Sequence, residues 1–210
     1  MEALARFAGN TAMRYYGTAT VQNGSNTAPV TEADRASNEC IVAGLLAAFG
    51  NDPVLSEESA DSQARLTSRR VWIVDPLDGT KEFLAQNGEF AVMIALAVAG
   101  TPTLGVVYLP ATNVMYSAEA GAGAWVEKLG ERSELKCEYV SGPLRMVSSR
   151  SHADPTLLEM QAALHITDVQ PSGSVGIKCA RIAEGERDVY IHPGPYLKEW
   201  DTCAPEIILR

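Results

Sequence analysis

The chain has 210 residues, of which 46% are hydrophobic and 20% are charged. This composition is ordinary for a globular protein with one large domain or two subdomains around a shared core. The formal net charge of −9 at pH 7 argues against long nucleic acid or an anionic membrane as the partner. The longest apolar run, residues 90–99, is too short to cross a bilayer as a helix, so we expect no transmembrane segment.

The four cysteines are Cys40, Cys137, Cys179 and Cys203, and none forms a Cys-x-x-Cys motif. This wide spacing argues against a zinc site or a disulfide framework and is typical of reduced thiols. Residues 1–6 lack the basic and then apolar pattern of a signal peptide. We therefore expect a cytoplasmic protein.

Two helices are expected near the start of the chain. The first spans residues 2–16, where apolar side chains recur on one helical face. Residues 22–29, rich in Asn, Gly and Ser, indicate a loop. The second helix spans residues 32–49 and begins after Thr31, with Asp34 three residues on at the spacing of a capping box.

The middle of the chain predicts a sheet. Apolar and β-branched segments bounded by turn residues favour strands over 53–57, 71–75, 90–99, 103–109, 113–118 and 123–127. This part resembles helices packed on an antiparallel sheet.

After Gly142-Pro143 the pattern changes to alternating strands and helices, which is typical of an α/β arrangement. The expected elements are strand 144–149, helix 154–163, strand 166–170, helix 174–184, strand 188–192 and a last helix from about residue 202. We therefore predict an N-terminal α+β subdomain over 1–141 and a C-terminal α/β subdomain over 142–210.

The segment that follows strand 71–75 is the most informative in the chain. Asp75 and Asp78 stand at the end of a buried strand, where ionised carboxylates are costly unless a cation neutralises them. Mg²⁺ takes oxygen ligands and is commonly held by carboxylates together with substrate phosphates. Gly79-Thr80 then offers backbone N–H groups at a helix start, where phosphate binds favourably. The alternative is an ordinary Asp-Pro turn.

Three further acidic positions are candidates for the same site. Glu57 and Glu58 follow an apolar segment and repel each other, which suits the bridging of two cations, although a solvated loop edge is the alternative. Asp34 is the acidic member of the capping box, and its carboxylate is also a candidate to hold the Thr80 hydroxyl.

Asp201 opens the last predicted helix, where Asp is usually an N-cap. If Asp201 were the cap, Pro205 would stand at a position whose N–H is needed inside the helix. A cap at Thr202 avoids this and leaves the Asp201 carboxylate free for another role.

Three segments occur in an order that resembles the inositol monophosphatase superfamily of Mg²⁺-dependent, lithium-sensitive phosphatases. They are Leu-Ser-Glu-Glu at 55–58, Trp-Ile-Val-Asp-Pro-Leu-Asp-Gly-Thr at 72–80 and Trp-Asp-Thr-Cys-Ala at 200–204. Lys-Glu-Phe at 81–83 is similar to the CysQ-type 3'(2'),5'-bisphosphate nucleotidases within that superfamily. The resemblance implies a layered αβαβα sandwich of the inositol monophosphatase and fructose-1,6-bisphosphatase type.

The resemblance also implies a site with two or three Mg²⁺ ions. The implied metal ligands are Glu57, Asp75, the Leu77 carbonyl, Asp78 and Asp201. In the implied catalytic group, Thr80 is supported by Asp34 and orients the attacking water, with Glu57 assisting. The implied substrate contacts are Leu77, Asp78, Gly79, Thr80, Gly173, Ser174 and Asp201.

The expected reaction is hydrolysis of the 3'-phosphate of adenosine 3',5'-bisphosphate. Two alternatives stay open: the same chemistry on an inositol phosphate or a sugar bisphosphate, and a non-catalytic metal- or nucleotide-binding module. Residues 22–28 lack the Lys that many relatives carry before Pro-Val-Thr, which puts its contribution in doubt. Residues 207–210 lie inside the last predicted helix, so we expect a C-terminal tail beyond them.

Overall fold

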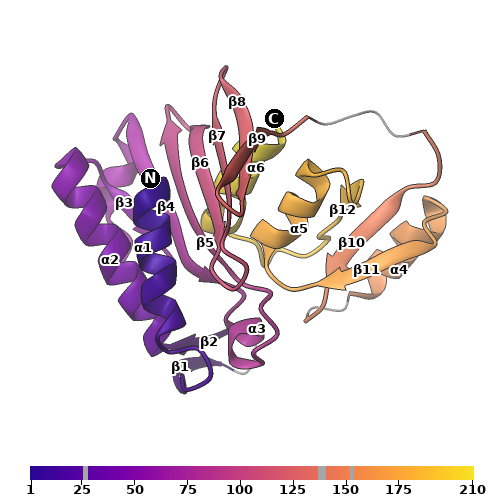
Figure 1. Cartoon of the computed structure of the whole chain (residues 1–210), viewed down its shortest axis with the longest axis horizontal. Helices are drawn as coiled ribbons and strands as arrows, with labels where there is room; N and C mark the ends of the chain where they lie inside the picture. Colours follow the sequence, from indigo (N-terminus) through magenta and orange to yellow (C-terminus); the bar gives the residue numbers. More distant parts are fainter. Residues whose placement is uncertain (26–27, 137–140, 152–153) are drawn as a thin grey trace.

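The computed structural model describes residues 1–25, 28–136, 141–151 and 154–210. Figure 1 shows their layers in order: two helices, a seven-stranded sheet, two helices, a three-stranded sheet and one outer helix. This αβαβα sandwich confirms the expected fold class.

The first layer contains α1 (Glu2–Met13) and α2 (Glu32–Phe49). Helix α1 ends earlier than predicted, and α2 has the predicted bounds because its capping box forms at Thr31. The prediction of a loop over residues 22–29 was wrong in part. Strands β1 (Val21–Ser25) and β2 (Ala28–Thr31) pair there as an antiparallel hairpin, whose polar residues carry no alternating pattern to reveal it. Residues 26–27 lie outside the described part of the chain.

The large sheet follows the chain from one edge to the other. Its strands are β3 (Val54–Ser56), β4 (Arg70–Asp78), β5 (Ala91–Val98), β6 (Thr101–Leu109), β7 (Val114–Glu119), β8 (Gly123–Lys128) and β9 (Glu131–Glu134). Strand β3 pairs with β4 in parallel, and the other neighbours are antiparallel. A short 3₁₀ helix, η1 (Gln63–Leu66), precedes β4. Strand β9 was not predicted because all its residues are polar and exposed.

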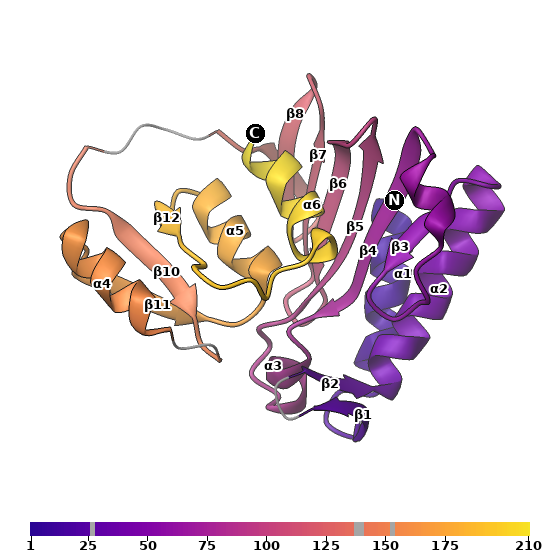
Figure 2. The same ribbon diagram turned by 180° about the vertical axis from the view of Figure 1, so that it is seen from behind.

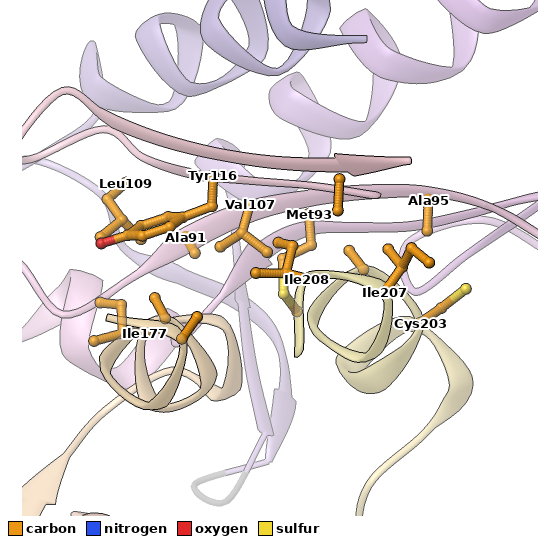
Figure 3. Close-up of a cluster of buried hydrophobic side chains, with 14 of the residues drawn as sticks. Ala91, Met93, Ala95, Val107, Leu109, Tyr116, Ile177, Cys203, Ile207 and Ile208 are labelled. Carbon is orange, nitrogen blue, oxygen red and sulfur yellow. The ribbon is translucent and has the colours of Figure 1, made fainter. Parts of the chain in front are cut away.

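The two faces of the large sheet carry separate cores. Trp72 and Val74 point to the side of α1 and α2, whereas Ile73 points to α5 (Val175–Ala183) and α6 (Glu199–Leu209). Figure 3 shows the second core, where Ile177 of α5 and Ile207 of α6 face the sheet. Figure 2 shows α6 lying along the sheet, with α1 and α2 on the far side.

The small sheet is parallel and has the order β11-β10-β12. Its strands are β10 (Arg145–Ser149), β11 (Asp168–Ser172) and β12 (Val189–Tyr190). Helix α4 (Pro155–Ala163) covers its outer face, where Met146, Leu157 and Ile166 pack together. The subdomain boundary near residue 141 stays a prediction.

Three of the cysteines, Cys40, Cys179 and Cys203, are free thiols, and Cys137 lies outside the described ranges. None of the helices within those ranges is long and apolar enough to cross a membrane.

Candidate functional site

The site is built on an irregularity in β4. Asp75 pairs with Met93 and Asp78 with Ala91, so β4 holds one residue more than β5 between these pairs. Residues three apart in a regular strand point to opposite faces, and an extra residue reverses this. The bulge therefore places Asp75 and Asp78 on the same side.

Neighbouring groups hold the bulge in place. The Ser37 hydroxyl of α2 donates to the Pro76 carbonyl at 2.7 Å. Proline is tolerated at this point because a bulge leaves one residue without a ladder partner. The Leu77 side chain is buried beside Phe83 and Phe90, away from the two carboxylates. The Asp-Pro turn of the sequence is thus a fixed feature inside a strand.

Asp75, Asp78 and Asp201 form a compact acidic cluster. One carboxylate oxygen from each lies within 4.8 Å of the others. Asp75 is 1% exposed and Asp78 is 7% exposed, while Asp201 is half-buried at the start of α6. The structure therefore brings together three of the five predicted metal ligands.

Each of these carboxylates is anchored through one oxygen by a backbone N–H. The three bonds are Leu77 N to Asp75 Oδ1 at 3.0 Å, Gly176 N to Asp78 Oδ2 at 2.8 Å and Lys198 N to Asp201 Oδ2 at 2.6 Å. The second oxygen of each carboxylate accepts no hydrogen bond from the residues that the structure describes. Three fixed carboxylates with free oxygens are a suitable donor set for a hard divalent cation.

The protonation equilibria support the same interpretation. Burial, followed by the charges of Glu57 and Asp78, raises the pKa of Asp75 well above its usual range. Burial and the charge of Asp78 raise the pKa of Asp201 to about 6. Both shifts favour the protonated forms of Asp75 and Asp201, and a bound cation would favour their ionised forms.

Glu57 lies beside the acidic cluster and is not a member of it. The residue as a whole is exposed, but many protein atoms surround its carboxylate. The resulting desolvation, together with the charge of Asp201, raises the pKa of Glu57 to about 8. Glu57 also lines a cavity of about 350 Å³ with Arg65, Lys198 and Trp200. A larger cavity of about 520 Å³ lies around Trp72 and holds none of the predicted site residues.

The start of the last helix differs from the prediction. Helix α6 begins at Glu199 rather than near residue 202, and Lys198 is its N-cap. Asp201 is the third helical residue and accepts from Lys198 N, so Thr202 is not the cap. Pro205 lies inside the helix. The prediction failed because it assigned Asp201 a single role, whereas one oxygen caps the helix and the other is left over.

Asp34 and Thr80 are in contact, as the sequence analysis predicted. Thr80 Oγ1 donates to Asp34 Oδ1 at 2.9 Å and lies 3.3 Å from the Leu77 carbonyl. The other oxygen, Asp34 Oδ2, accepts from Thr31 N at 2.8 Å and from Thr31 Oγ1 at 2.6 Å. Burial raises the pKa of Asp34. The capping box and the contact with Thr80 are therefore both present.

Gly79 precedes Thr80 at the start of α3 (Thr80–Leu84). Its φ of +98° belongs to the left-handed region that glycine adopts without strain, and a Cβ there would lie 2.8 Å from the Glu89 carbonyl oxygen. The turn into α3 therefore requires glycine.

The backbone N–H of Gly173 and the hydroxyl of Ser174 already donate hydrogen bonds to other protein groups. Gly173 N donates to Glu89 Oε2 at 2.7 Å, and the Ser174 hydroxyl donates to Asp78 Oδ2. A Cβ at Gly173 would lie 2.3 Å from Glu82 Cγ. Both residues lie next to the acidic cluster, and their contact with a substrate stays a prediction.

Lys178 is a neighbouring residue that the sequence analysis missed. It is 3% exposed, one turn after Ser174 in α5, and its Nζ lies 5.0 Å from the centre of the Tyr190 ring. Burial lowers the Lys178 pKa, and the nearby charge of Asp78 acts in the opposite direction. The sequence signal that could have revealed Lys178 is a lysine among the apolar residues of the predicted helix 174–184.

Comparison with known proteins agrees with this geometry. Residues 1–210 match the family model described as the inositol monophosphatase family. The chain is 44% identical over 205 residues to the 3'(2'),5'-bisphosphate nucleotidase CysQ of Escherichia coli O157:H7, and the match covers 96% of this chain and 82% of that protein. CysQ of Salmonella typhimurium is 42% identical over 209 residues, covering 98% and 83%.

A solved structure supports the same assignment. CysQ from Bacteroides thetaiotaomicron, a bacterial member of the inositol monophosphatase family, matches with a TM-score of 0.81 at 35% identity. The match covers 98% of this chain and 82% of that one. The chain therefore belongs to the inositol monophosphatase family.

Proposed function

We propose that the protein is a Mg²⁺-dependent phosphomonoesterase that hydrolyses adenosine 3',5'-bisphosphate to AMP and phosphate. The observation that carries the chemistry is the set of three anchored carboxylates, each with one oxygen free. The proposed substrate follows the relatives from Escherichia coli and Salmonella, which are named 3'(2'),5'-bisphosphate nucleotidases. The cytoplasm, where free thiols stay reduced, is the proposed compartment.

The proposed Mg²⁺ ligands are Asp75, Asp78 and Asp201, with Glu57 and the Leu77 carbonyl at the edge of the cluster. We propose two or three ions. When bound, the ions supply Lewis-acid stabilisation of the phosphoryl oxygens and lower the pKa of water.

Side chains of the protein carry out the remaining steps of the proposed reaction. The Thr80 hydroxyl has one proton and uses it in its hydrogen bond to Asp34. The lone pairs of Thr80 Oγ1 are left to accept a hydrogen bond from the attacking water. This contact orients the water in line with the phosphorus atom. Glu57, at the edge of the acidic cluster, is proposed to accept a proton from that water once bound cations favour its ionised form.

The proposed phosphate contacts are the backbone of residues 77–80 together with the backbone of Gly173 and Ser174, rather than the Ser174 side chain. Gly79 brings the backbone close to the substrate without a side chain in the way. Asp78 and Asp201 are proposed to contact the sugar as well as the cations.

Phosphate release from a panel of substrates tests the proposal. The panel contains adenosine 3',5'-bisphosphate, inositol 1-phosphate and fructose 1,6-bisphosphate. Each substrate is assayed once in the presence of Mg²⁺ and once in excess EDTA, and Asp201→Asn serves as the variant that lacks a proposed metal ligand. We expect the nucleotide to give the highest kcat/KM, EDTA to abolish turnover and Asp201→Asn to remove most of it.

Each other outcome has a definite meaning. Preference for the inositol or sugar phosphate would overturn the substrate and keep the metal chemistry. Full turnover in EDTA would overturn the metal mechanism. Mg²⁺ binding without turnover of any substrate would indicate a non-catalytic binding module.

A further inference from the structure

Asp78 receives two hydrogen bonds at one oxygen, and both come from the start of α5. The Ser174 hydroxyl and Gly176 N donate to Asp78 Oδ2, from positions 96 and 98 residues further along the chain. Asp78 Oδ1 accepts no hydrogen bond from any residue in the described ranges. The start of α5 therefore determines which Asp78 oxygen stays free.

The Ser174 hydroxyl has no proton left for a substrate. An ionised carboxylate has no proton to give, so the single hydroxyl proton must lie between Ser174 and Asp78. Ser174 Oγ also accepts a hydrogen bond from Ile177 N at 3.1 Å and so caps α5. Ser174 is 5% exposed. These contacts do not suit a residue whose main role is to donate to a substrate phosphate.

The backbone of Ser174 is also held in an unusual conformation. Its φ of +53° and ψ of +131° lie in a region that residues other than glycine rarely occupy. Glycine, which has no Cβ, adopts a positive φ more readily. Strain of this kind persists only where surrounding contacts hold it, and the contacts here are those of the hydroxyl with Asp78 and Ile177.

We propose that Ser174 is a positioning residue for the metal site: it fixes Asp78 through Oδ2 so that Oδ1 is presented to the cation. The inference rests on the proposed function, because it takes Asp78 as a metal ligand. Partners that orient a ligating carboxylate commonly contribute tenfold or more to metal affinity.

Three variants separate this role from substrate binding and from folding. Ser174→Gly removes the hydroxyl and relieves the positive φ, which offsets the lost cap of α5, so we expect the fold to be retained. Ser174→Ala removes the hydroxyl and keeps a Cβ at the positive φ. The matched control is Ser117→Ala, which alters a buried serine of β7 whose Oγ accepts from Arg132 at 3.2 Å.

Mg²⁺ binding is measured by calorimetry without substrate, and KM is measured for adenosine 3',5'-bisphosphate at saturating Mg²⁺. For Ser174→Gly we expect Mg²⁺ affinity to fall roughly tenfold or more, with KM changed less than about twofold because the substrate loses no donor. Ser174→Ala should lower the Mg²⁺ affinity to a similar extent, and Ser117→Ala should leave it unchanged.

An unchanged Mg²⁺ affinity with a raised KM in Ser174→Gly would overturn the inference and assign Ser174 to the substrate. A Ser174→Ala protein that keeps the Mg²⁺ affinity of the wild type would also overturn it, since the hydroxyl would then not be the cause. Both results leave the proposed function standing if the wild type binds Mg²⁺ and releases phosphate. A wild type that binds no Mg²⁺ would overturn both.

Discussion

Asp34 uses its two carboxylate oxygens for different partners. One oxygen completes the capping box of α2 with Thr31, and the other accepts from Thr80. A change at Asp34 therefore affects both the helix and the proposed water-orienting group, whereas a change at Thr80 affects only the latter.

We expect Thr80→Ala and Asp34→Ala each to lower kcat by about 100-fold or more with little change in KM, since the contact acts mainly in the transition state. Asp34→Ala should also lower the free energy of unfolding by about 1 kcal/mol through the lost cap. The double variant should be little slower than the slower single variant. Steady-state kinetics and thermal unfolding of the three proteins check this.

Thr31→Ala is the control, because it removes a capping side chain and leaves the contact between Asp34 and Thr80. It should lower the melting temperature and spare kcat. Multiplicative losses of kcat in the double variant would show that Asp34 and Thr80 act independently.

The residues of the site differed in how well the sequence revealed them. Asp75 and Asp78 were candidates because carboxylates after a buried strand have few structural reasons to be there, whereas Asp201 was named through the family resemblance, since Asp at a helix start is usually a cap. Lys178 was missed because a single lysine in a helix usually points to solvent. The contact of Ser174 with Asp78 joins residues far apart in the chain, and no local pattern encodes it.

At the scale of elements, α6 carries Asp201 to the sheet. Gly105 of β6 allows this approach, because a Cβ there would lie 2.3 Å from Ile207 Cγ2 and 2.8 Å from the Ala204 carbonyl oxygen. The position of Asp201 relative to Asp75 therefore depends on the absence of a side chain at residue 105.

We expect Gly105→Ala to lower the free energy of unfolding by about 1–3 kcal/mol, because it overpacks a close contact. It should also raise the Mg²⁺ concentration needed for half-maximal activity, since α6 is displaced. Urea unfolding and Mg²⁺ titration of activity measure the two effects. Gly100→Ala is the control: its φ is +76°, nothing lies within 4 Å, and only stability should fall. Unchanged Mg²⁺ dependence in Gly105→Ala would show that α6 is not displaced.

The elements were predictable where local patterns are strong. Helix α2 was placed correctly because its capping box and apolar period agree. Strand β9 and the β1–β2 hairpin were not found, because polar residues become strands there only through pairing with a neighbouring strand. Helix α6 was placed too late because Asp201 serves two purposes.

At the scale of the whole molecule, the acidic site opposes folding when no cation is bound. The raised pKa values of Glu57, Asp75 and Asp201 mean that the folded state holds protons that the unfolded state releases. The stability from these groups is fully present below about pH 4, the ordinary range of carboxyl pKa values, and is lost as pH rises through about 6 and then 8.

We expect the melting temperature of the metal-free protein to fall between about pH 5 and pH 8. Mg²⁺ should raise the melting temperature more at pH 8 than at pH 5, since it binds the ionised carboxylates. Differential scanning fluorimetry with EDTA or Mg²⁺ across this range tests both points. Carboxylates with lowered pKa, such as Asp188 at about 2, do not interfere, because their effect is confined to more acid solution.

Asp201→Asn should flatten the dependence of the metal-free protein on pH, because it removes one titrating carboxylate. A melting temperature that rises steadily from pH 5 to pH 8 without metal would contradict the assignment of these pKa values.

The bulge in β4 makes the site depend on strand register as well as on residue type. If β4 slipped by one residue against β5 and the bulge closed, Asp75 and Asp78 would stand three apart in a regular strand, and Asp78 would turn toward the apolar layer of α1 and α2. Every carboxylate would still be encoded, yet the site would be gone and a charge would be buried. Changes that allow this slip are therefore a distinct class of inactivating change, because they need not alter any residue of the site.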